Sequence, residues 1–328
     1  MQILVLTHAD VERLLPMSEC ISLMSDALSQ LARGQVHQPL RMIVRPPQAK
    51  GLLAMMPAHL AGPRPALGVK ALSFFPSNPS IGKDAHQGSV LLYDNDTGEL
   101  RALINASAIT AIRTAAVSGV ATRALAREDA SVLALIGAGV EARTHLEAMA
   151  SVRPLQLARV VSLRQERAEQ FAKEMAARFQ FPIVASPSVE EAVRGAQIIV
   201  TATTAREPVL RHDWVARGTH INAVGASLPT HREIDSATVR ASSLFVDRRE
   251  SALAEAGDFL LAVNDGAIGK DHIRGELGEV LIGSVPGRQA RDELTLFKSL
   301  GLAVEDVASA DFLYAKAKEV GAGSWVDF

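Results

Sequence analysis

The sequence predicts an α/β protein in which a doubly wound parallel sheet is joined to a second, discontinuous α+β domain. The chain of 328 residues is too long for one ordinary domain and suits two. Short apolar runs alternate with helical patterns through its middle, which is typical of a parallel sheet with crossover helices. An amphipathic pattern at 306–318 follows this region and is expected to return to the N-terminal part. We therefore expect one domain of 1–115 with 305–328, and another of 116–304.

The most informative motif is Gly-x-Gly-x-x-Ala at residues 137–142. It follows an apolar run long enough for a buried strand and opens directly into a helical pattern. Gly137 permits a tight turn, Gly139 lets backbone amides approach a pyrophosphate, and Ala142 lets the helix lie close to its strand. A bare Gly-x-Gly is weak evidence, but these flanks are those of the Rossmann dinucleotide-binding fold.

The region around this motif shows the alternation that a Rossmann sheet requires. Helical stretches at 166–178 and 189–194 separate several of its apolar runs. The six candidate strands are 132–136, 159–163, 182–184, 197–201, 219–224 and 243–247.

The N-terminal region has a different pattern. A helical period over 10–33, closed by Gly34, predicts a scaffold helix. Short runs at 42–44, 51–56 and 68–74, and a hairpin of 89–94 with 100–104, predict a mixed or antiparallel sheet. Three further segments are an irregular loop at 76–84, a helix of small residues at 107–125 and an amphipathic stretch at 276–281.

Composition excludes several classes of partner. Lys and Arg number 34 against 36 Asp and Glu, so the net charge is −2 and no global field favours nucleic acid or an anionic membrane. The single cysteine, Cys20, lies in a helical pattern and is expected to be buried and inert. No apolar run reaches membrane-spanning length, and residues 1–5 do not resemble a signal peptide. We expect a cytoplasmic protein.

The residue after the second strand of the nucleotide fold indicates which dinucleotide is bound. An acidic residue there usually binds the ribose 2′-hydroxyl of NAD. Here the strand runs into Arg164, whose guanidinium suits a 2′-phosphate, and the first carboxylate is Glu166. The alternative is a surface arginine at a helix start. The sequence favours NADPH, with NADH possible.

Three cations stand in apolar surroundings, where an unpaired charge is costly. Arg41 follows Gln38-Pro39-Leu40, Lys70 lies inside a strand pattern, and Arg113 lies inside the small-residue helix. Taken singly, each is explained by an internal ion pair or by a side chain that reaches solvent.

Other polar residues have ordinary explanations. His59, His145, His220 and His231 show no spacing that would gather metal ligands, so no metal is expected. His86 either lines a pocket or is structural. Asp306 is expected to cap the helix that follows it.

Several separate motifs occur together in one order, and in this combination the chain resembles the ornithine cyclodeaminase and mu-crystallin family over essentially its whole length. The matching pieces are Gln38–Arg41, Met56–Ala58, Gly68–Lys70, His86–Val90, Ile109–Ala116, Gly137–Gly139, Ile221–Ser227, Glu276–Glu279, Phe297–Gly301 and Val304–Asp306.

The resemblance implies roles for individual residues. Arg41 and Arg113 match the arginines that hold the substrate α-carboxylate, Lys70 matches the lysine beside the reacting carbon and nitrogen, and Ser89 stands where members carry Thr or Ser. A homodimer built through the N-terminal sheet is implied, with the site between that sheet and the nucleotide domain. The residues expected to contact the cofactor are Arg113, Thr114, Gly137, Ala138, Gly139, Val140, Arg164, Thr201, Ala202, Thr203, Val224, Gly225 and Ala226.

One departure discriminates among the activities in the family. Where cyclodeaminases carry a proton-transferring aspartate, this chain has Ser227, which does not ionise near neutral pH. The expected activity is therefore NAD(P)H-dependent reduction of small cyclic ketimine carboxylates, Δ1-pyrroline-2-carboxylate or Δ1-piperideine-2-carboxylate, with Ser227 at the substrate. Ornithine cyclodeamination, alanine dehydrogenase-type chemistry and an NADPH-dependent binding protein without turnover remain alternatives.

Overall fold

The computed structural model describes residues 2–62 and 64–328, and these form two compact units. Unit 1 comprises residues 1–113 and 301–328, and unit 2 comprises residues 114–300. The units divide two residues before the first expected boundary and four before the second. Met1 and Pro63, which fall in the expected first domain, lie outside the described residues.

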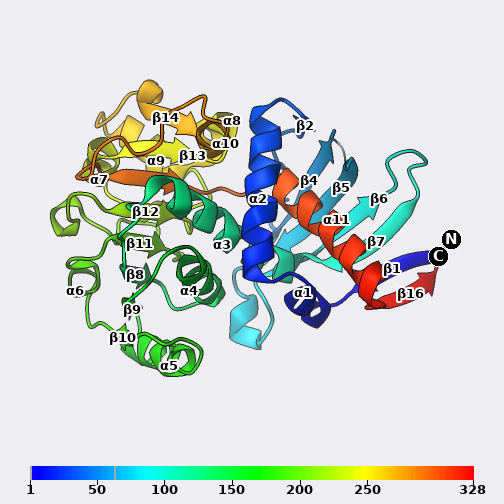
Figure 1. The fold of residues 1–328 in the computed structure, drawn as a ribbon, viewed down its shortest axis with the longest axis horizontal. Helices are drawn as coiled ribbons and strands as arrows, with labels where there is room; N and C mark the ends of the chain where they lie inside the picture. Colours follow the sequence, from blue (N-terminus) through cyan, green and yellow to red (C-terminus); the bar gives the residue numbers. More distant parts are fainter. Residues whose placement is uncertain (1, 63) are drawn as a thin grey trace. The chain divides into compact units, whose positions relative to one another are not determined.

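Unit 1 is built on a mixed eight-stranded sheet, ordered β16-β1-β7-β6-β5-β4-β2, with β3 paired to β4 (Figure 1). β1 runs parallel to β7, and the other pairs are antiparallel. The strands are β1 Gln2–Leu6, β2 Val36–His37, β3 Met42–Val44, β4 Leu52–Leu60, β5 Ala66–Phe74, β6 His86–Tyr93, β7 Leu100–Asn105 and β16 Ser324–Asp327. The helices are α1 His8–Leu14, α2 Met17–Ala32, the 3₁₀ turn η1 Asn78–Ile81, the first part of α3 Ala106–Leu125, and α11 Ala303–Val320.

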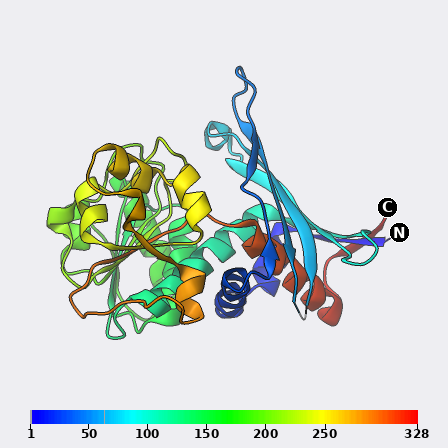
Figure 2. The same ribbon diagram turned by 90° about the horizontal axis from the view of Figure 1, so that it is seen from above.

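One face of this sheet packs against α11, which contacts β4, β5 and β6 and is itself covered by α2 (Figure 2). Strand β4 alternates accordingly: Leu52, Ala54, Met56, Ala58 and Leu60 are buried, and the residues between them are partly or fully exposed. Every residue from Ala303 to Ala310 is buried, so this part of α11 is enclosed on all sides.

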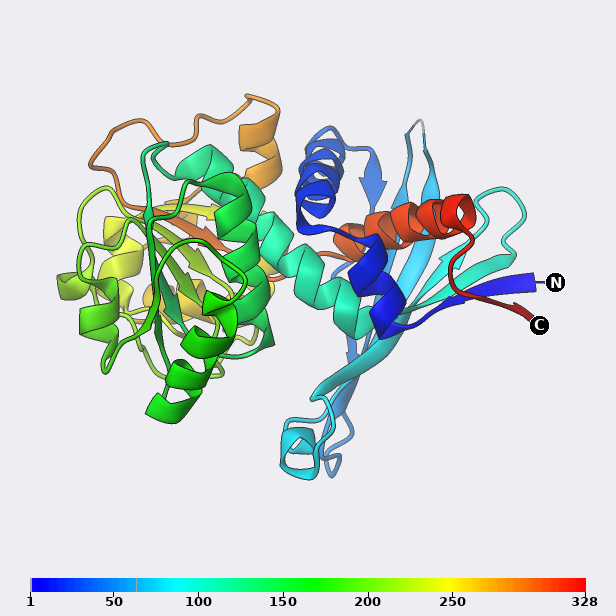
Figure 3. The same cartoon turned by 60° about the horizontal axis from the view of Figure 1, so that its bottom comes forward.

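The N-terminal prediction of one long helix was wrong in detail, and short strands of unit 1 were missed. The single helix expected over 10–33 is two helices, because Pro16 cannot donate the amide that would continue α1 and instead precedes the first turn of α2. Strands β1 and β16 were not predicted, and they pair over Gln2–Val5 with Ser324–Asp327. The loop at 76–84 contains η1 and extends past the end of the sheet (Figure 3).

Unit 2 contains an eight-stranded, fully parallel sheet in the order β10-β9-β8-β11-β12-β15-β13-β14. Its strands are β8 Val132–Ile136, β9 Leu157–Val161, β10 Ile183–Ala185, β11 Ile198–Thr201, β12 His220–Ala223, β13 Ser243–Val246, β14 Ile273–Glu276 and β15 Thr295–Lys298. Its helices are α4 Val140–Val152, α5 Gln165–Ala176, α6 Val189–Val193, α7 Ser236–Ala241, α8 Arg249–Glu255, α9 Gly257–Asn264 and α10 Leu277–Leu281, with 3₁₀ turns η2 His212–Trp214 and η3 Lys270–His272.

This sheet confirms the predicted fold class. All six expected strands are present, and the central β11, β12 and β15 are buried along their full length, as in a parallel sheet covered on both faces. Strand order reverses at β8, which has β9 on one side and β11 on the other. Such a reversal is where doubly wound folds bind ligands. β14 and β15 were not predicted, and the stretch at 276–281 is the end of β14 followed by α10.

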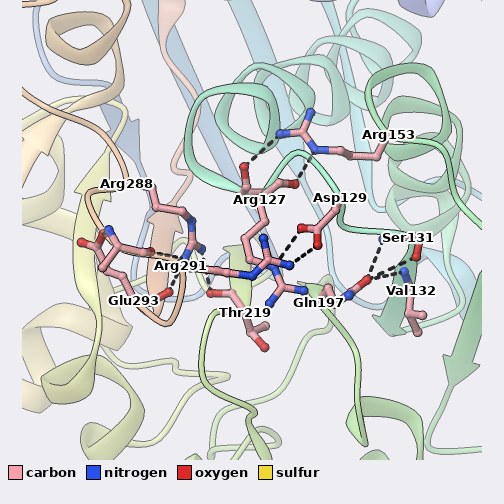
Figure 4. A network of polar contacts seen from close by, with 12 residues as sticks. Arg127, Asp129, Ser131, Val132, Arg153, Gln197, Thr219, Arg288, Arg291 and Glu293 are labelled. Atoms are coloured by element: carbon pink, nitrogen blue, oxygen red, sulfur yellow. Dashed lines mark hydrogen bonds and ion pairs between the residues drawn. The ribbon is translucent and has the colours of Figure 1, made fainter.

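The C-terminal end of α3 is held by two arginines (Figure 4). The guanidinium of Arg153 donates to the carbonyls of Thr122, Arg123, Ala126 and Arg127. Arg288 donates to the carbonyl of Leu125. A helix leaves its last carbonyls without partners inside the helix, and cations there also interact favourably with its dipole. These contacts anchor α3 within unit 2.

No helix in the described part of the chain is long and apolar enough to cross a membrane.

Candidate functional site

The turn between β8 and α4 has the backbone that the glycine motif predicts. Gly137 has φ of 117°, and a Cβ atom there would lie 2.4 Å from the carbonyl oxygen of Ala202. A Cβ on Gly139 would meet nothing within 4 Å. Gly137 is thus required by the fold, whereas the space at Gly139 is open.

The first turn of α4 is suited to an anion. Gly139 is the N-cap, and no side chain caps the amides that follow it. Those amides and the helix dipole favour a phosphate at this point. Ala138 and Val140 flank Gly139, and Val140 is exposed. The turn therefore fits the pyrophosphate of a dinucleotide.

Arg164 follows β9 and is the N-cap residue of α5, with its side chain exposed. The neighbouring Leu163 is fully exposed, which is unusual for a leucine. An exposed guanidinium in this position can form charge-assisted hydrogen bonds with a phosphate group.

The loops after β11 and β12 hold the remaining expected cofactor residues of unit 2. Glu233 joins these loops, because its carboxylate accepts hydrogen bonds from Thr201, Thr203 and Gly225. Ala202, Val224, Ala226 and Ser227 belong to the same loops, and Ser227 is half-buried. Thr114 is buried in α3.

Unit 1 contains a cluster of buried charges. The Nζ atom of Lys70 lies 2.6 Å from Oδ2 of Asp306. Arg113 donates from Nη1 to Glu305 at 2.8 Å and from Nε to Asp306 at 3.2 Å. Lys70 is 1% exposed and both carboxylates are fully buried. The ion-pair explanation for Lys70 and Arg113 is therefore confirmed.

Arg41 joins this cluster through Gly301. Its Nη2 atom donates to the carbonyl oxygen of Gly301 at 3.3 Å. A Cβ atom on Gly301 would lie 2.5 to 3.0 Å from the guanidinium of Arg113. The two arginines thus approach the same glycine.

Charge and burial set the protonation of Lys70. Burial is the main cause that lowers its pKa, Asp306 opposes this, and the charges of Arg113 and Arg41 add to the lowering, so that the pKa is about 8. Lys70 is thus mainly protonated at neutral pH. Three cations and two carboxylates give these five groups one net positive charge, which suits a monoanionic ligand.

Ser89 is not brought together with this cluster. Strand register pairs Lys70 with Val90 and pairs Ser89 with Ala71. Because side chains alternate along a strand, Ser89 lies on the opposite face of the sheet from Lys70.

His86 lies on the same sheet face as Lys70, four residues from Val90, and its ring stacks on Phe74 with centroids 4.6 Å apart. Partial burial and the charge of Lys70 lower the pKa of His86.

Sequence reasoning missed the two carboxylates. The interpretation of Asp306 as a helix cap was wrong, because Leu302 is the N-cap of α11 and Asp306 lies inside the helix. Glu305 was assigned no role. A signal was present, since two adjacent acids stand in a helix whose other nearby residues are apolar, and such acids need cationic partners.

Two further expectations concern Cys20 and metals. Cys20 is buried, and burial raises the pKa of its thiol, so it stays protonated. No group of three His, Cys, Asp or Glu residues with metal-binding geometry occurs within residues 2–62 and 64–328.

Comparison with known proteins identifies the family. Residues 1–321 match the model of the ornithine cyclodeaminase/mu-crystallin family. The chain belongs to this family. Ketimine reductase mu-crystallin of Mus musculus is 42% identical over 281 residues, which are 86% of this chain and 85% of that protein. The resemblance inferred from the sequence motifs is thereby confirmed.

Solved structures agree with this assignment. Δ1-Pyrroline-2-carboxylate reductase of Thermococcus litoralis, in complex with NADH and L-proline, has a TM-score of 0.95 and 42% identity, covering 98% of this chain and 99% of that one. An archaeal alanine dehydrogenase dimer with bound NAD has a TM-score of 0.94 and 34% identity, with both chains covered completely. The family members with this fold thus include amino-acid oxidoreductases.

Proposed function

We propose that this protein reduces the C=N bond of small cyclic ketimine carboxylates with NADPH, yielding proline from Δ1-pyrroline-2-carboxylate or pipecolate from Δ1-piperideine-2-carboxylate. The observation that carries the proposal is the buried ammonium of Lys70, paired with Asp306 and accompanied by Arg41 and Arg113. The activities named for the mouse and Thermococcus relatives support it.

The chain's residues have distinct tasks in this reaction. Arg41 and Arg113 bind the substrate carboxylate through charge-assisted hydrogen bonds and fix its orientation. Lys70 donates a proton to the imine nitrogen, for which a pKa of about 8 is well matched near neutral pH. Asp306 holds the Lys70 ammonium in place, and Glu305 holds Arg113. When bound, NADPH supplies the hydride that reduces the imine carbon.

The cofactor is assigned to unit 2. The turn at Gly137–Gly139 with the start of α4 binds the pyrophosphate, and Arg164 binds the 2′-phosphate that distinguishes NADPH from NADH. The similar structures named above contain NADH or NAD, so the preference for NADPH rests on Arg164 alone.

The alternatives differ in what they require of these residues. Cyclodeamination of ornithine needs a base where Ser227 stands, and a serine hydroxyl does not supply one near neutral pH. Reductive amination of pyruvate, by contrast, would use the same arginines and lysine. A binding protein without turnover has no use for a proton donor beside a carboxylate site. The relatives named for ketimine and pyrroline-2-carboxylate reduction are 42% identical to this chain and the alanine dehydrogenase is 34% identical, which favours ketimine reduction.

We also propose a homodimer formed through the sheet of unit 1. On the face opposite α11, Pro57, Val69, Leu91 and Leu103 form one apolar row across four strands, each side chain partly exposed. Near it, Met42, Ile43, Val44 and Leu53 are exposed. Apolar surface of this kind is typical of an interface. The archaeal alanine dehydrogenase relative is a dimer, which makes a second copy the expected occupant.

The reaction itself is tested by following NADPH oxidation with a panel of substrates: Δ1-pyrroline-2-carboxylate, Δ1-piperideine-2-carboxylate, and pyruvate with ammonia. Ammonia release from ornithine is assayed in parallel. We expect the highest kcat/KM with a cyclic ketimine. Turnover of ornithine alone would refute the proposal, and a preference for pyruvate with ammonia would replace it with alanine dehydrogenase chemistry.

Lys70→Met is expected to lower kcat at least about 100-fold, which is the usual contribution of a general acid. Because this change leaves Asp306 buried beside one fewer cation, the matched control is Lys70→Met with Asp306→Asn, which restores the charge balance. Both should bind NADPH as the unmodified protein does. In the unmodified protein kcat/KM should fall as pH rises through about 8, where Lys70 loses its proton. Near-normal turnover by the double variant would exclude Lys70 as the proton donor.

Arg164→Ser is expected to weaken NADPH binding at least about tenfold and to leave NADH binding nearly unchanged, because it removes a charged contact to the 2′-phosphate. The measurement is the ratio of the two dissociation constants. Lys173→Ser, an exposed change in the same helix α5, should not alter that ratio. An unmodified protein that binds NADH more tightly than NADPH would overturn the assignment.

Val69→Arg is expected to convert a dimer into a monomer, since it inserts a charge into the middle of the apolar row. Sedimentation velocity measures the oligomeric state. Val184→Arg, at an exposed strand valine in unit 2, serves as the control and should remain dimeric. A monomeric unmodified protein, or a Val69→Arg variant that stays dimeric, would contradict the proposed interface.

A further inference from the structure

A second set of buried charges lies in unit 2, beneath the loops that follow β11 and β12. It consists of Glu233, Asp258 and Lys298, each 0 to 2% exposed. The Nζ atom of Lys298, at the end of β15, lies 2.9 Å from Oδ2 of Asp258. Two carboxylates and one ammonium leave this group with one net negative charge. A buried charge of this kind is costly, so it calls for an explanation.

Glu233 accepts hydrogen bonds at all of its acceptor positions. Oε1 accepts from the amide of Thr203 at 2.6 Å and from its hydroxyl at 2.7 Å. Oε2 accepts from the hydroxyl of Thr201 at 2.8 Å and from the amide of Gly225 at 2.7 Å. Burial and the charge of Asp258 raise the pKa of Glu233, whereas the charge of Lys298 and the hydrogen bonds from Thr203 oppose that rise. Each carboxylate oxygen accepts from one backbone amide and one hydroxyl, and this arrangement favours the ionised form. One side chain thus ties together the ends of two adjacent strands.

Residues near Glu233 fix the position of its carboxylate. Asp258 accepts from the amides of Glu233 and Ile234 at 2.7 and 3.0 Å, which fixes the backbone behind the side chain. A Cβ atom on Gly225 would lie 2.6 Å from Oε1 of Glu233 and 2.1 Å from the carbonyl oxygen of Thr203. Glycine at 225 is therefore required for the contact.

The topology of unit 2 places this charge under one half of the dinucleotide. The pyrophosphate site is the turn after β8, and Arg164 marks the adenosine side beyond β9. A dinucleotide that crosses the carboxyl edge of such a sheet puts its other half over β11 and β12. That half carries the nicotinamide ring, which is neutral when reduced and positively charged when oxidised.

We propose that Glu233 is a positioning residue that orders the loops Thr201–Thr203 and Val224–Ala226, and that its negative charge favours the oxidised nicotinamide over the reduced one. This inference rests on the proposed function, because it takes unit 2 to bind a nicotinamide dinucleotide. Positive charge develops on the ring as hydride leaves it. A fixed negative charge nearby, out of contact with water, stabilises that change without reorganisation of solvent.

The test is the binding of oxidised and reduced cofactor to the purified full-length protein, measured by titration calorimetry in the absence of substrate. Glu233→Gln removes the charge and keeps the side-chain volume. We expect the dissociation constant for NADP⁺ to rise about tenfold more than that for NADPH, because the variant lacks the negative charge that favours the positively charged ring. The readout does not depend on turnover.

Thr203→Val is the matched control. It removes one hydrogen bond to Glu233 and disturbs the same loop. The amides of Thr203 and Gly225 and the hydroxyl of Thr201 still donate to the carboxylate, which keeps its charge. Thr203→Val should raise the dissociation constants for NADP⁺ and NADPH by the same factor and leave the ratio of the two constants unchanged. Far-ultraviolet circular dichroism and thermal unfolding establish that both variants are folded.

The outcomes separate this inference from the function on which it rests. If Glu233→Gln weakens both cofactor forms equally, the electrostatic role is refuted while cofactor binding stands. If Thr203→Val shifts the ratio as much as Glu233→Gln does, loop order rather than charge is responsible, and the electrostatic role again fails. If the unmodified protein binds neither form, the proposed function itself fails.

Discussion

The ion pair between Lys70 and Asp306 is the contact on which unit 1 depends. Neither group touches water, so each would be strongly disfavoured without the other. Asp306 comes from α11, near the end of the chain, and Lys70 comes from β5, near its beginning. Arg113 also bonds Asp306 and so adds α3 to the same arrangement. Electrostatics therefore joins three elements that are far apart in sequence, and the apolar packing of α11 on the sheet surrounds that contact.

Unit 2 is organised by backbone geometry around its glycines. At Gly137 and Gly225 a side chain would collide with the neighbouring loops, whereas at Gly139 it would project into open space. The first two positions are needed for the loops to pack, and the third leaves the helix terminus accessible. The Gly-x-Gly motif thus contains one glycine that the packing of the loops requires, Gly137, and one that leaves room for a ligand, Gly139.

The sequence predicted the elements whose signals are local. The parallel sheet followed from apolar runs and the glycine turn, and all six expected strands are present. The break at Pro16 was missed because the apolar period continues through it, although proline cannot. β16 is a short edge strand that pairs with β1, and β1 pairs in turn with β7. Both strands form because of these pairings, a cause that no local pattern contains.

The sequence likewise predicted the cations of the candidate site but not their acidic partners. Lys70, Arg41 and Arg113 were found because cations in apolar surroundings need an explanation, but their partners Glu305 and Asp306 lie about two hundred residues away from Arg113 and Lys70 in sequence. Periodicity alone could not pair them. Ser89 was expected at the substrate from its place in a motif, and the register of β6 then placed it on the other face of the sheet.

The pairing of β1 with β16 has a consequence for the connectivity of the chain. Gln2 lies opposite Asp327, so the described N-terminal and C-terminal segments meet at the edge of one sheet. A short flexible connector between them would close the polypeptide into a ring without breaking a contact within unit 1. New ends opened in an exposed turn, such as Asn95–Gly98 between β6 and β7, would then give a circularly permuted protein with the same fold. The sequence order of the helices and strands can thus be changed while their arrangement in the fold stays the same.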